Sequence, residues 1–201
     1  SAANRLDSNL SRAVCLLQGH TGKIVVSGLG KSGLIGQKIA ATLCSTGTPA
    51  VFMHPAEALH GDLGIYAPGD PTVLLSKSGN TAELVRLVPT LRQFRSPIIA
   101  ILGSRKCLLA NEVDVVLDAS VEREADPCNI APTSSTIVAL AIGDALCCAL
   151  MKARNFTVED FARFHPGGQL GRTILTKVEE VFHRKDKTAV VSPGSSVKEV
   201  V

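Results

Sequence analysis

The chain has 201 residues, of which 45% are apolar and 19% charged, enough to bury one full hydrophobic core. Its 21 basic and 18 acidic residues leave a net charge of only +3, which argues against a nucleic-acid partner, because phosphate-backbone binding needs a strongly basic surface. The longest apolar run, 136–151, is shorter than a bilayer-spanning helix of about 20 residues and contains Asp144, so we expect a buried helix and no membrane. The N-terminus lacks the pattern of a signal peptide, which predicts a cytoplasmic protein.

Short, continuously apolar runs recur along the first 120 residues and predict parallel strands buried on both faces. They lie at 23–27, 50–53, 72–76, 98–102 and 113–118. Helices are expected between them, at 33–45, 55–59, 81–94 and 107–112. Strands that alternate with helices imply right-handed crossovers. The predicted fold class is therefore α/β, a three-layer αβα sandwich on a five-stranded parallel sheet of flavodoxin-like order 2-1-3-4-5.

A second kind of helix is predicted after a polar, proline-containing stretch at 120–132. Thr133 is expected to cap this helix, Ser134–Ala153, which is apolar on nearly every side. Such a helix must be covered on most of its surface, so one face is expected on the sheet and another on a second subunit.

The C-terminal stretch follows a different pattern. Thr157 and Asp160 have capping-box spacing and predict a short helix ending near Phe164. Residues 178–201 predict a charged turn, a short Val-Val strand, a Pro-Gly-Ser turn and the start of another helix, which is too little to bury a core. We therefore expect a main domain at 1–177 and the start of an incomplete one at 178–201.

The cysteines show neither a disulfide framework nor a metal-binding spacing. They occupy positions 15, 44, 107, 128, 147 and 148, with no C-x-x-C pair. All six are expected to be reduced and non-catalytic, as small buried side chains in a reducing compartment.

The glycine loop after the first strand has the order G-x-G-x-x-G, at Gly28, Gly30 and Gly33. A dinucleotide-binding turn would also need an acidic residue at the end of the second strand, which instead reads Val-Phe-Met-His. A P-loop is excluded because it would require glycine where Val25 stands. The loop is then either a site for a small anion, through Lys31 and Ser32 at a helix start, or simply a tight turn with a solvated lysine.

A loop after the third strand, Ser-Lys-Ser-Gly-Asn-Thr at 76–81, places three hydroxyls at another helix N-terminus. Hydroxyls, backbone N–H groups and a helix dipole suit a phosphate monoester, although Ser- and Thr-rich helix caps are also common. In the predicted strand order, strands one and three are neighbours where the winding reverses, so the two loops would face one crevice. We expect a pocket for one phosphate and a short organic body.

Several longer motifs carry a family resemblance: GLGKSG, STGTPAVFMHPAEALHGDLG, SKSGNTAE, APTSST, GDAL and FHPGGQLGR. In this order and spacing they resemble the sugar isomerase (SIS) domain of bacterial D-arabinose 5-phosphate isomerases, over about residues 5–175. The tail from Val178 resembles the opening of a CBS-domain pair. The resemblance implies interconversion of D-ribulose 5-phosphate and D-arabinose 5-phosphate through an enediolate. It also implies supply of KDO for lipopolysaccharide or capsule, and a homotetramer.

The resemblance implies four catalytic residues. Lys31 would stabilise the oxyanion or phosphate charge, either Glu83 or Glu124 would move the carbon proton, and His165 would transfer hydroxyl protons or assist ring opening. On the residues alone, Glu83 would be a first-turn helix carboxylate, Glu124 a solvated loop charge and His165 a helix-end contact.

The resemblance also implies a set of substrate contacts. These are Ser32, Gly47, Thr48, His54, His60, Ser76, Ser78 and Thr81. No cofactor is required, and His54 with His60 could hold only an adventitious, non-catalytic zinc, because two histidines make an incomplete zinc site.

The sequence departs from the family pattern at two places near the site. Lys77 stands where the family more often has Asn or Gln, and could strengthen phosphate binding by its charge. The segment Asp-Pro-Cys-Asn at 126–129 replaces the commoner A-C-P-L-G beside Glu124, which leaves the orientation of that glutamate open.

Two other functions fit the same residues. One is a non-catalytic phosphosugar-binding regulatory module, which would need the loop at 76–81 but not Glu83, Glu124 and His165 together. The other is an isomerase of another phosphosugar, since the sequence does not fix the number of carbons in the substrate.

Overall fold

A parallel sheet forms the centre of the molecule. The computed structural model describes residues 7–182 and 190–200. The five strands lie in the order β2-β1-β3-β4-β5, and every neighbouring pair is parallel. Their bounds are β1 Ile24–Gly28, β2 Ala50–Met53, β3 Thr72–Ser76, β4 Ile98–Leu102 and β5 Val115–Asp118. This confirms the predicted fold class and strand order.

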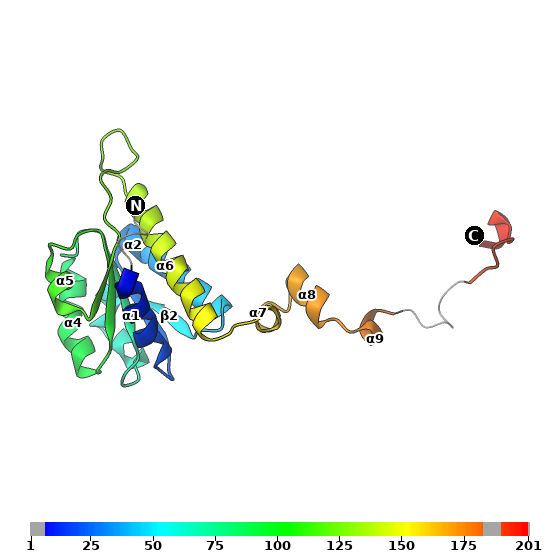
Figure 1. Ribbon diagram of the computed structural model, residues 1–201, viewed down its shortest axis with the longest axis horizontal. Coiled ribbons are helices and arrows are strands. Elements are labelled where there is room, and N and C mark those ends of the chain that lie inside the picture. Colours follow the sequence, from blue (N-terminus) through cyan, green and yellow to red (C-terminus); the bar gives the residue numbers. More distant parts are fainter. Residues whose placement is uncertain (1–6, 183–189, 201) are drawn as a thin grey trace.

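Helices cover both faces of the sheet and give three layers (Figure 1). On one face pack α1 (Asp7–Gln18), α2 (Gly30–Ser45) and α6 (Ser134–Ala153). On the other lie α3 (Pro55–Ala58), the 3-10 helix η2 (Asp62–Ile65), α4 (Ala82–Gln93) and α5 (Leu108–Glu112).

Alternating strand residues supply the two apolar cores. In β1, Val26 packs beneath α2 and α6, whereas Val25 faces the layer of α4. In β3, Leu75 packs on the side of α2 and α6, and Leu74 on the side of α4. Because successive side chains of a strand point to opposite faces, a strand covered on both sides is apolar at most of its positions. This is the physical origin of the continuous apolar runs in the sequence.

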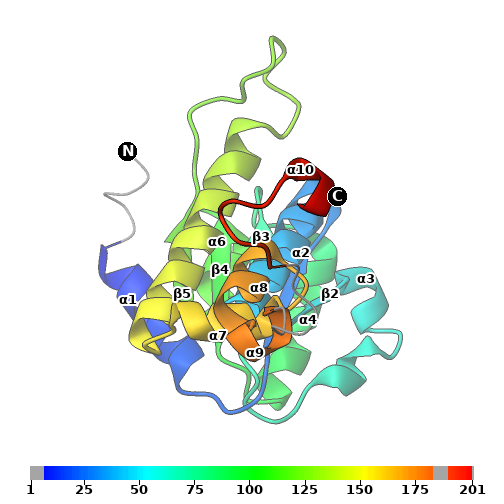
Figure 2. The same cartoon turned by 90° about the vertical axis from the view of Figure 1, so that its right-hand side faces the viewer.

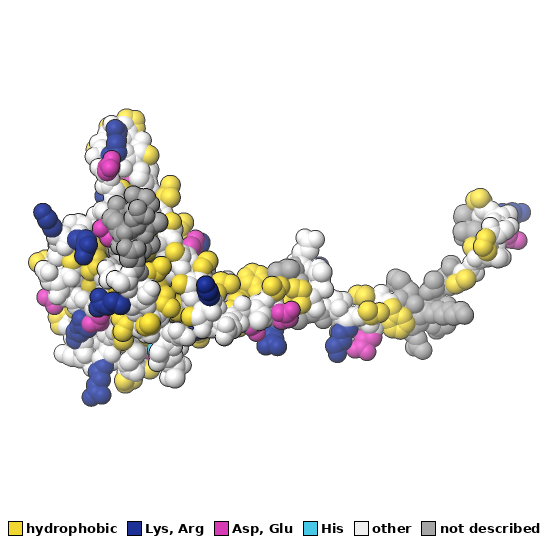
Figure 3. Space-filling view, viewed as in Figure 1, with side chains coloured by type: hydrophobic (Ala, Val, Ile, Leu, Met, Phe, Trp, Pro, Cys, Tyr) yellow, Lys and Arg dark blue, Asp and Glu magenta, His cyan; other side chains and the backbone are white. Residues whose placement is uncertain are grey.

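Helix α6 has the predicted bounds, but its surroundings differ from those of a fully buried helix. By length and composition alone this helix could cross a membrane, and a third of its apolar stretch is buried in the molecule. Core helices of soluble proteins can have the same length and composition. One side packs on α2 and α1, through residues such as Ile142 and Leu146. Ile137 on another side is 68% exposed, and hydrophobic side chains are visible along this part of the molecule (Figure 3).

Several element boundaries differ from the predicted ones. Helix α1 was not predicted, although Leu10, Ala13 and Leu17 have helical spacing and pack in the core. Helix α2 begins at Gly30 and not at Gly33, which places Lys31 and Ser32 in its first turn.

The C-terminal helices extend away from the globule (Figure 1), and Figure 2 views the molecule from their side, with these helices in front of the sheet. They are α7 Val158–Phe164, α8 Gln169–Leu175, α9 Val178–Val181 and α10 Val197–Val200. The capping box of Thr157 and Asp160 is confirmed, with both reciprocal hydrogen bonds formed.

The expected Val-Val strand is not present: Val190 and Val191 have no strand conformation. A strand needs a neighbouring strand to bond its backbone, and Val190 is 71% exposed. The Pro-Gly-Ser turn and the following helix do form, with Ser195 N donating to Ser192 O at 3.0 Å. The charged turn expected at 183–187 lies outside the described residues.

All six cysteines are free thiols, but only Cys107 and Cys147 are buried. The expectation of small buried side chains therefore holds for two of them and is wrong for the other four, which lie on exposed faces of helices or in a loop.

Candidate active site

The glycine loop makes a close strand-to-helix corner between β1 and α2. A Cβ at Gly33 would lie 2.6 Å from the carbonyl oxygen of Gly28, so only glycine permits this approach. Gly30 has a φ of +58°, which favours glycine. The first-turn N–H groups of α2 have no partner within the helix and lie beside Lys31 and Ser32, as an anion site requires.

The loop at 76–81 is held in one shape by its own side chains. The Ser76 hydroxyl accepts a hydrogen bond from Gly79 N at 2.9 Å and lies 3.0 Å from the Thr81 hydroxyl. Asn80 ties the loop to α5 by accepting a bond from Leu108 N at 2.9 Å. The hydroxyls are therefore preorganised at the start of α4.

The two loops meet at adjoining cavities at the carboxyl ends of β1 and β3. Lys31, Ser32 and Ser76 line the first cavity, and Ser32, Ser76, Ser78 and Thr81 line the second. Five predicted site residues therefore come together in one crevice. The lining is completed by Lys77 after β3, Gly103 after β4, and Ser135 and Thr136 in the first turn of α6.

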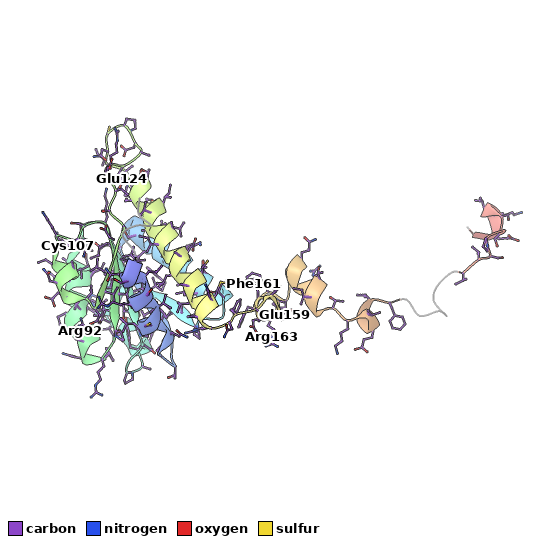
Figure 4. The ribbon with its side chains drawn as sticks, in the orientation of Figure 1. Arg92, Cys107, Glu124, Glu159, Phe161 and Arg163 are labelled. Atoms are coloured by element: carbon purple, nitrogen blue, oxygen red, sulfur yellow. The ribbon has the colours of Figure 1, made fainter. Side chains whose placement is uncertain are left out.

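Glu124 is buried beside this crevice, in the loop next to the N-terminal end of α6 (Figure 4). One carboxylate oxygen accepts bonds from Thr133 N at 2.9 Å, Ser135 N at 3.1 Å and the Thr133 hydroxyl at 3.2 Å. The other accepts from the Ser135 hydroxyl at 2.5 Å and lies 2.6 Å from the Lys77 ammonium. The Lys77 ammonium first, and then the Ser135 hydroxyl, lower the pKa of Glu124 far below its ordinary value, although burial opposes them. Glu124 is thus a fixed, fully bonded anion and not a solvated loop charge.

The cap of α6 differs from the predicted one. The Thr133 side chain does not cap the helix; its hydroxyl accepts a bond from Ala125 N at 2.8 Å. The Glu124 carboxylate instead accepts from the first-turn N–H of Ser135 and from Thr133 N, a favourable position for an anion because the helix dipole is positive there.

The unusual 126–129 segment orients Glu124. Asn129 adopts a φ of +56°, and its side-chain oxygen accepts a bond from Glu124 N at 2.6 Å. The Asp126 carboxylate accepts bonds from the backbone N–H groups of residues 128, 130 and 131. The departure from the family pattern is therefore a self-bonded turn that fixes the loop around the glutamate.

Three predicted residues lie at the same edge of the sheet but line neither cavity. His54 follows β2, where its Nδ1 accepts a bond from Ala56 N at 3.3 Å, and His60 is exposed beyond α3. Glu83 is half-buried in the first turn of α4. Within residues 7–182 and 190–200, its carboxylate forms no hydrogen bond or ion pair.

Gly47, Thr48 and His165 lie elsewhere. The turn before β2 is at the amino end of the sheet, where Thr48 is buried and accepts a bond from Arg154. A Cβ at Gly47 would lie 2.8 Å from the ring of Phe156, which stacks with Phe164.

His165 ends α7, away from Glu124. Its ring stacks on Phe161 at 3.9 Å, and Figure 4 shows Phe161 well separated from Glu124. Its Nδ1 lies 2.8 Å from the Phe161 carbonyl oxygen and must donate, because a carbonyl only accepts. In the neutral imidazole this leaves Nε2 as a proton acceptor.

The described part of the chain contains no group of three or more His, Cys, Asp and Glu side chains that could hold a metal ion. His54 and His60 therefore lack a third protein ligand there. That no cofactor is required stays a prediction.

The contact that sequence reasoning missed is that of Lys77 with Glu124. From the sequence, the charge of Lys77 predicts stronger phosphate binding and gives no sign of a contact with Glu124. Ser135 belongs to the APTSST motif, but nothing in its sequence indicated that both its N–H and its hydroxyl bind a glutamate eleven residues earlier.

A model of the SIS domain family matches residues 19–149 of the chain. The chain belongs to the SIS domain family. Arabinose 5-phosphate isomerase KdsD of Pseudomonas aeruginosa is 50% identical over 193 residues, which is 96% of this chain and 59% of that protein. Arabinose 5-phosphate isomerase KpsF of Escherichia coli is 48% identical over 181 residues, covering 90% of this chain and 57% of that protein. This SIS chain therefore spans somewhat more than half the length of these curated relatives.

A solved structure extends the similarity to the fold. A chain from E. coli CFT073, in complex with arabinose 5-phosphate, has a TM-score of 0.77 and 40% identity to this SIS domain. The match covers 82% of this chain and 89% of that chain. The predicted SIS fold is thereby confirmed.

Proposed function

We propose that this SIS domain is an aldose–ketose isomerase that interconverts D-ribulose 5-phosphate and D-arabinose 5-phosphate through an enediolate. The crevice at the carboxyl ends of β1 and β3 carries the proposal. Lys31, Ser32, Ser76, Ser78 and Thr81 line it and supply one ammonium, four hydroxyls and two helix N-termini for a phosphate monoester. The activity for which the relatives are named, and the arabinose 5-phosphate complex of the similar chain, favour this substrate.

The reaction needs a cation for the developing oxyanion, a base for the carbon proton and a group that relays hydroxyl protons. We assign the first role to Lys31 and the last to Nε2 of His165. Of the two glutamates, the geometry favours Glu83 as the base, because every accessible acceptor position of Glu124 is taken and the Glu83 carboxylate is unbonded among the described residues.

A complete site needs more than one copy of the chain in this proposal. His165 lies on α7 outside the globule, and the exposed apolar side of α6 offers a surface for a second subunit. We propose a homotetramer in which a neighbour supplies His165. Mixing inactive Lys31→Ala and His165→Ala subunits should restore part of the activity, because some mixed sites then carry both groups. Persistent inactivity of mixtures that do exchange subunits would contradict sharing of the site.

The direct test of the activity is incubation with ribulose 5-phosphate, followed by NMR of the sugar carbons. The arabinose isomer should appear, with deuterium from heavy water at C2, the carbon that is protonated when the ketose becomes the aldose. Five-, six- and seven-carbon phosphosugars in the same assay define the substrate and detect an isomerase of another phosphosugar. Turnover should survive a chelator, since we propose no required cofactor and only an adventitious zinc at His54.

A non-catalytic phosphosugar-binding module is the second candidate. One observation favours it: of the four proposed catalytic residues, only Lys31 lines the crevice of the single chain. Such a module would bind the phosphosugars and convert none of them.

The wider setting of the enzyme is also a proposal. We infer that it is cytoplasmic and supplies D-arabinose 5-phosphate for KDO, used in lipopolysaccharide or capsule. Residues 178–201 are proposed to begin a CBS-type domain. The described part of that segment is largely exposed, as expected for elements without a core of their own.

A further inference from the structure

Lys77 joins the crevice to a buried carboxylate. It follows β3, is 48% exposed and lines both cavities. Its ammonium lies 2.6 Å from an oxygen of Glu124, which is only 1% exposed. One side chain therefore faces the proposed ligand position and also contacts Glu124.

Burial alone would keep Glu124 protonated, because a carboxylate loses its hydration energy away from water. The donors from Thr133 and Ser135 are neutral groups. Among the described residues, Lys77 supplies the one positively charged group that contacts this carboxylate. It also contributes a charge-assisted bond, which is stronger than a neutral one.

Other charged groups lie on the segments next to the crevice and in the loop of Glu124. Lys31 begins α2 and lines the same cavity as Lys77. Asp118 ends β5, with an oxygen that accepts from Ser120 N. In the loop of Glu124 itself, Arg123 donates to the backbone oxygen of Glu124 and Asp126 binds its own turn.

We propose that Lys77 is a positioning residue that holds Glu124 as a fixed carboxylate against the N-terminus of α6, so that Glu124 cannot accept a proton in the ligand-free protein. Neutralising Lys77 should convert Glu124 into a titrating group. Only the kinetic part of this inference rests on the proposed isomerase function.

The decisive measurement is the pKa of Glu124 by ¹³C NMR of protein labelled at the glutamate side-chain carboxyl. The signal is assigned as the one missing from Glu124→Gln. In the wild type it should show no midpoint between pH 3 and 8. In Lys77→Gln the loss of the opposite charge should raise the pKa by about 1 to 3, because the unchanged burial of Glu124 is then no longer opposed by an ammonium, and this brings the midpoint into the range.

Two variants separate the ion pair from other effects. Lys77→Arg keeps the positive charge and should leave Glu124 without a midpoint in the range. Lys106→Gln removes an exposed positive charge from the loop after β4, at the same edge of the sheet, and should also leave it unchanged. Thermal unfolding of each variant checks that it is folded.

The kinetic readout is the pH dependence of kcat/KM for ribulose 5-phosphate. In Lys77→Gln, protonation of Glu124 removes the anion that bonds Thr133 and Ser135 beside the crevice, so the acid side should fall at the midpoint that NMR gives for Glu124. A purely structural role of Lys77 would not produce this displacement. Lys77→Arg should restore the wild-type acid side.

Two results would overturn the role of Lys77: a Glu124 midpoint above pH 3 in the wild type, or no midpoint in folded Lys77→Gln. The wild-type titration needs no variant of Lys77, so it can contradict the inference even if Lys77→Gln folds poorly. If the wild type converts no phosphosugar, the proposed isomerase function fails, and the NMR titration still decides what Lys77 does.

Discussion

Replacing Gly79 by alanine should distort the loop that carries the phosphate-binding hydroxyls. Gly79 has a φ of +68°, and a Cβ there would lie 2.1 Å from Sγ and 2.7 Å from Cβ of Cys107. Cys107 is buried and its thiol donates to Ser104 O, so it has little freedom to move away. The substitution thus combines an unfavourable backbone conformation with a clash.

Gly30 provides a matched control that separates these two effects. Its φ of +58° is similar, but a Cβ there would meet nothing within 4 Å. The left-handed conformation costs a non-glycine residue about 1–2 kcal/mol, partly offset by about 0.4–1 kcal/mol from the stiffer unfolded chain. Gly30→Ala should therefore destabilise by roughly 1 kcal/mol. Gly79→Ala adds overpacking of about 1–3 kcal/mol and should cost roughly 2–4 kcal/mol in total.

Urea unfolding followed by circular dichroism measures both costs. For a chain of this size, 1 kcal/mol corresponds to about 2–4 °C in Tm, so thermal scans give a second reading. In a Cys107→Gly background, the cost of Gly79→Ala should fall to that of Gly30→Ala. Equal costs for the two alanine variants in the wild-type background, or strict additivity with Cys107→Gly, would refute the proposed clash.

Three further outcomes are expected. Burial alone would raise the pKa of Asp70, but the hydrogen bonds that its carboxylate accepts, led by that from Lys23, lower this pKa. The stability that Asp70 contributes is therefore present above about pH 4 and is lost as the pH falls below that value. Asp70→Asn should cost roughly 1–3 kcal/mol at pH 7, and its difference in Tm from the wild type should shrink in acid; a constant difference would contradict this. Lys31→Ala and His165→Ala should stay folded and lose at least about 100-fold in kcat, so near-wild-type turnover in either would exclude its assigned role. Burial raises the pKa of Cys147 to about 12, so alkylation read by mass spectrometry should label it only after unfolding.

The sequence by itself determined the architecture. Runs such as 73–75 and 98–102 are apolar at every position because both faces of the strand are covered, and this signal needs no knowledge of neighbours. The alternation with helices and the fixed hand of the crossovers indicated a doubly wound sheet, and 2-1-3-4-5, which the structure confirms, is one of the common strand orders of such sheets. Local rules also gave the capping box at Thr157 and the helix Ser134–Ala153.

The sequence also indicated part of the crevice. Lys31 and the hydroxyls of Ser76, Ser78 and Thr81 follow two strands that the topology makes neighbours, so their meeting could be predicted. Contacts between long polar side chains could not, because they depend on directions that no local pattern fixes. The Lys77–Glu124 pair and the capping of α6 by Glu124 are of this kind.

Tertiary structure alone decided which of the resembling motifs share a site within one chain. Gly47 and Thr48 precede β2 and therefore lie at the amino end of the sheet, opposite the crevice, while His165 is on a helix outside the globule. A motif gives residue identity, but a parallel sheet separates groups before a strand from groups after it by the length of that strand. Glu124 shows most directly what the sequence leaves open. The segment around it has the sequence of a charged surface loop, but five donors from two other segments make Glu124 a buried anion.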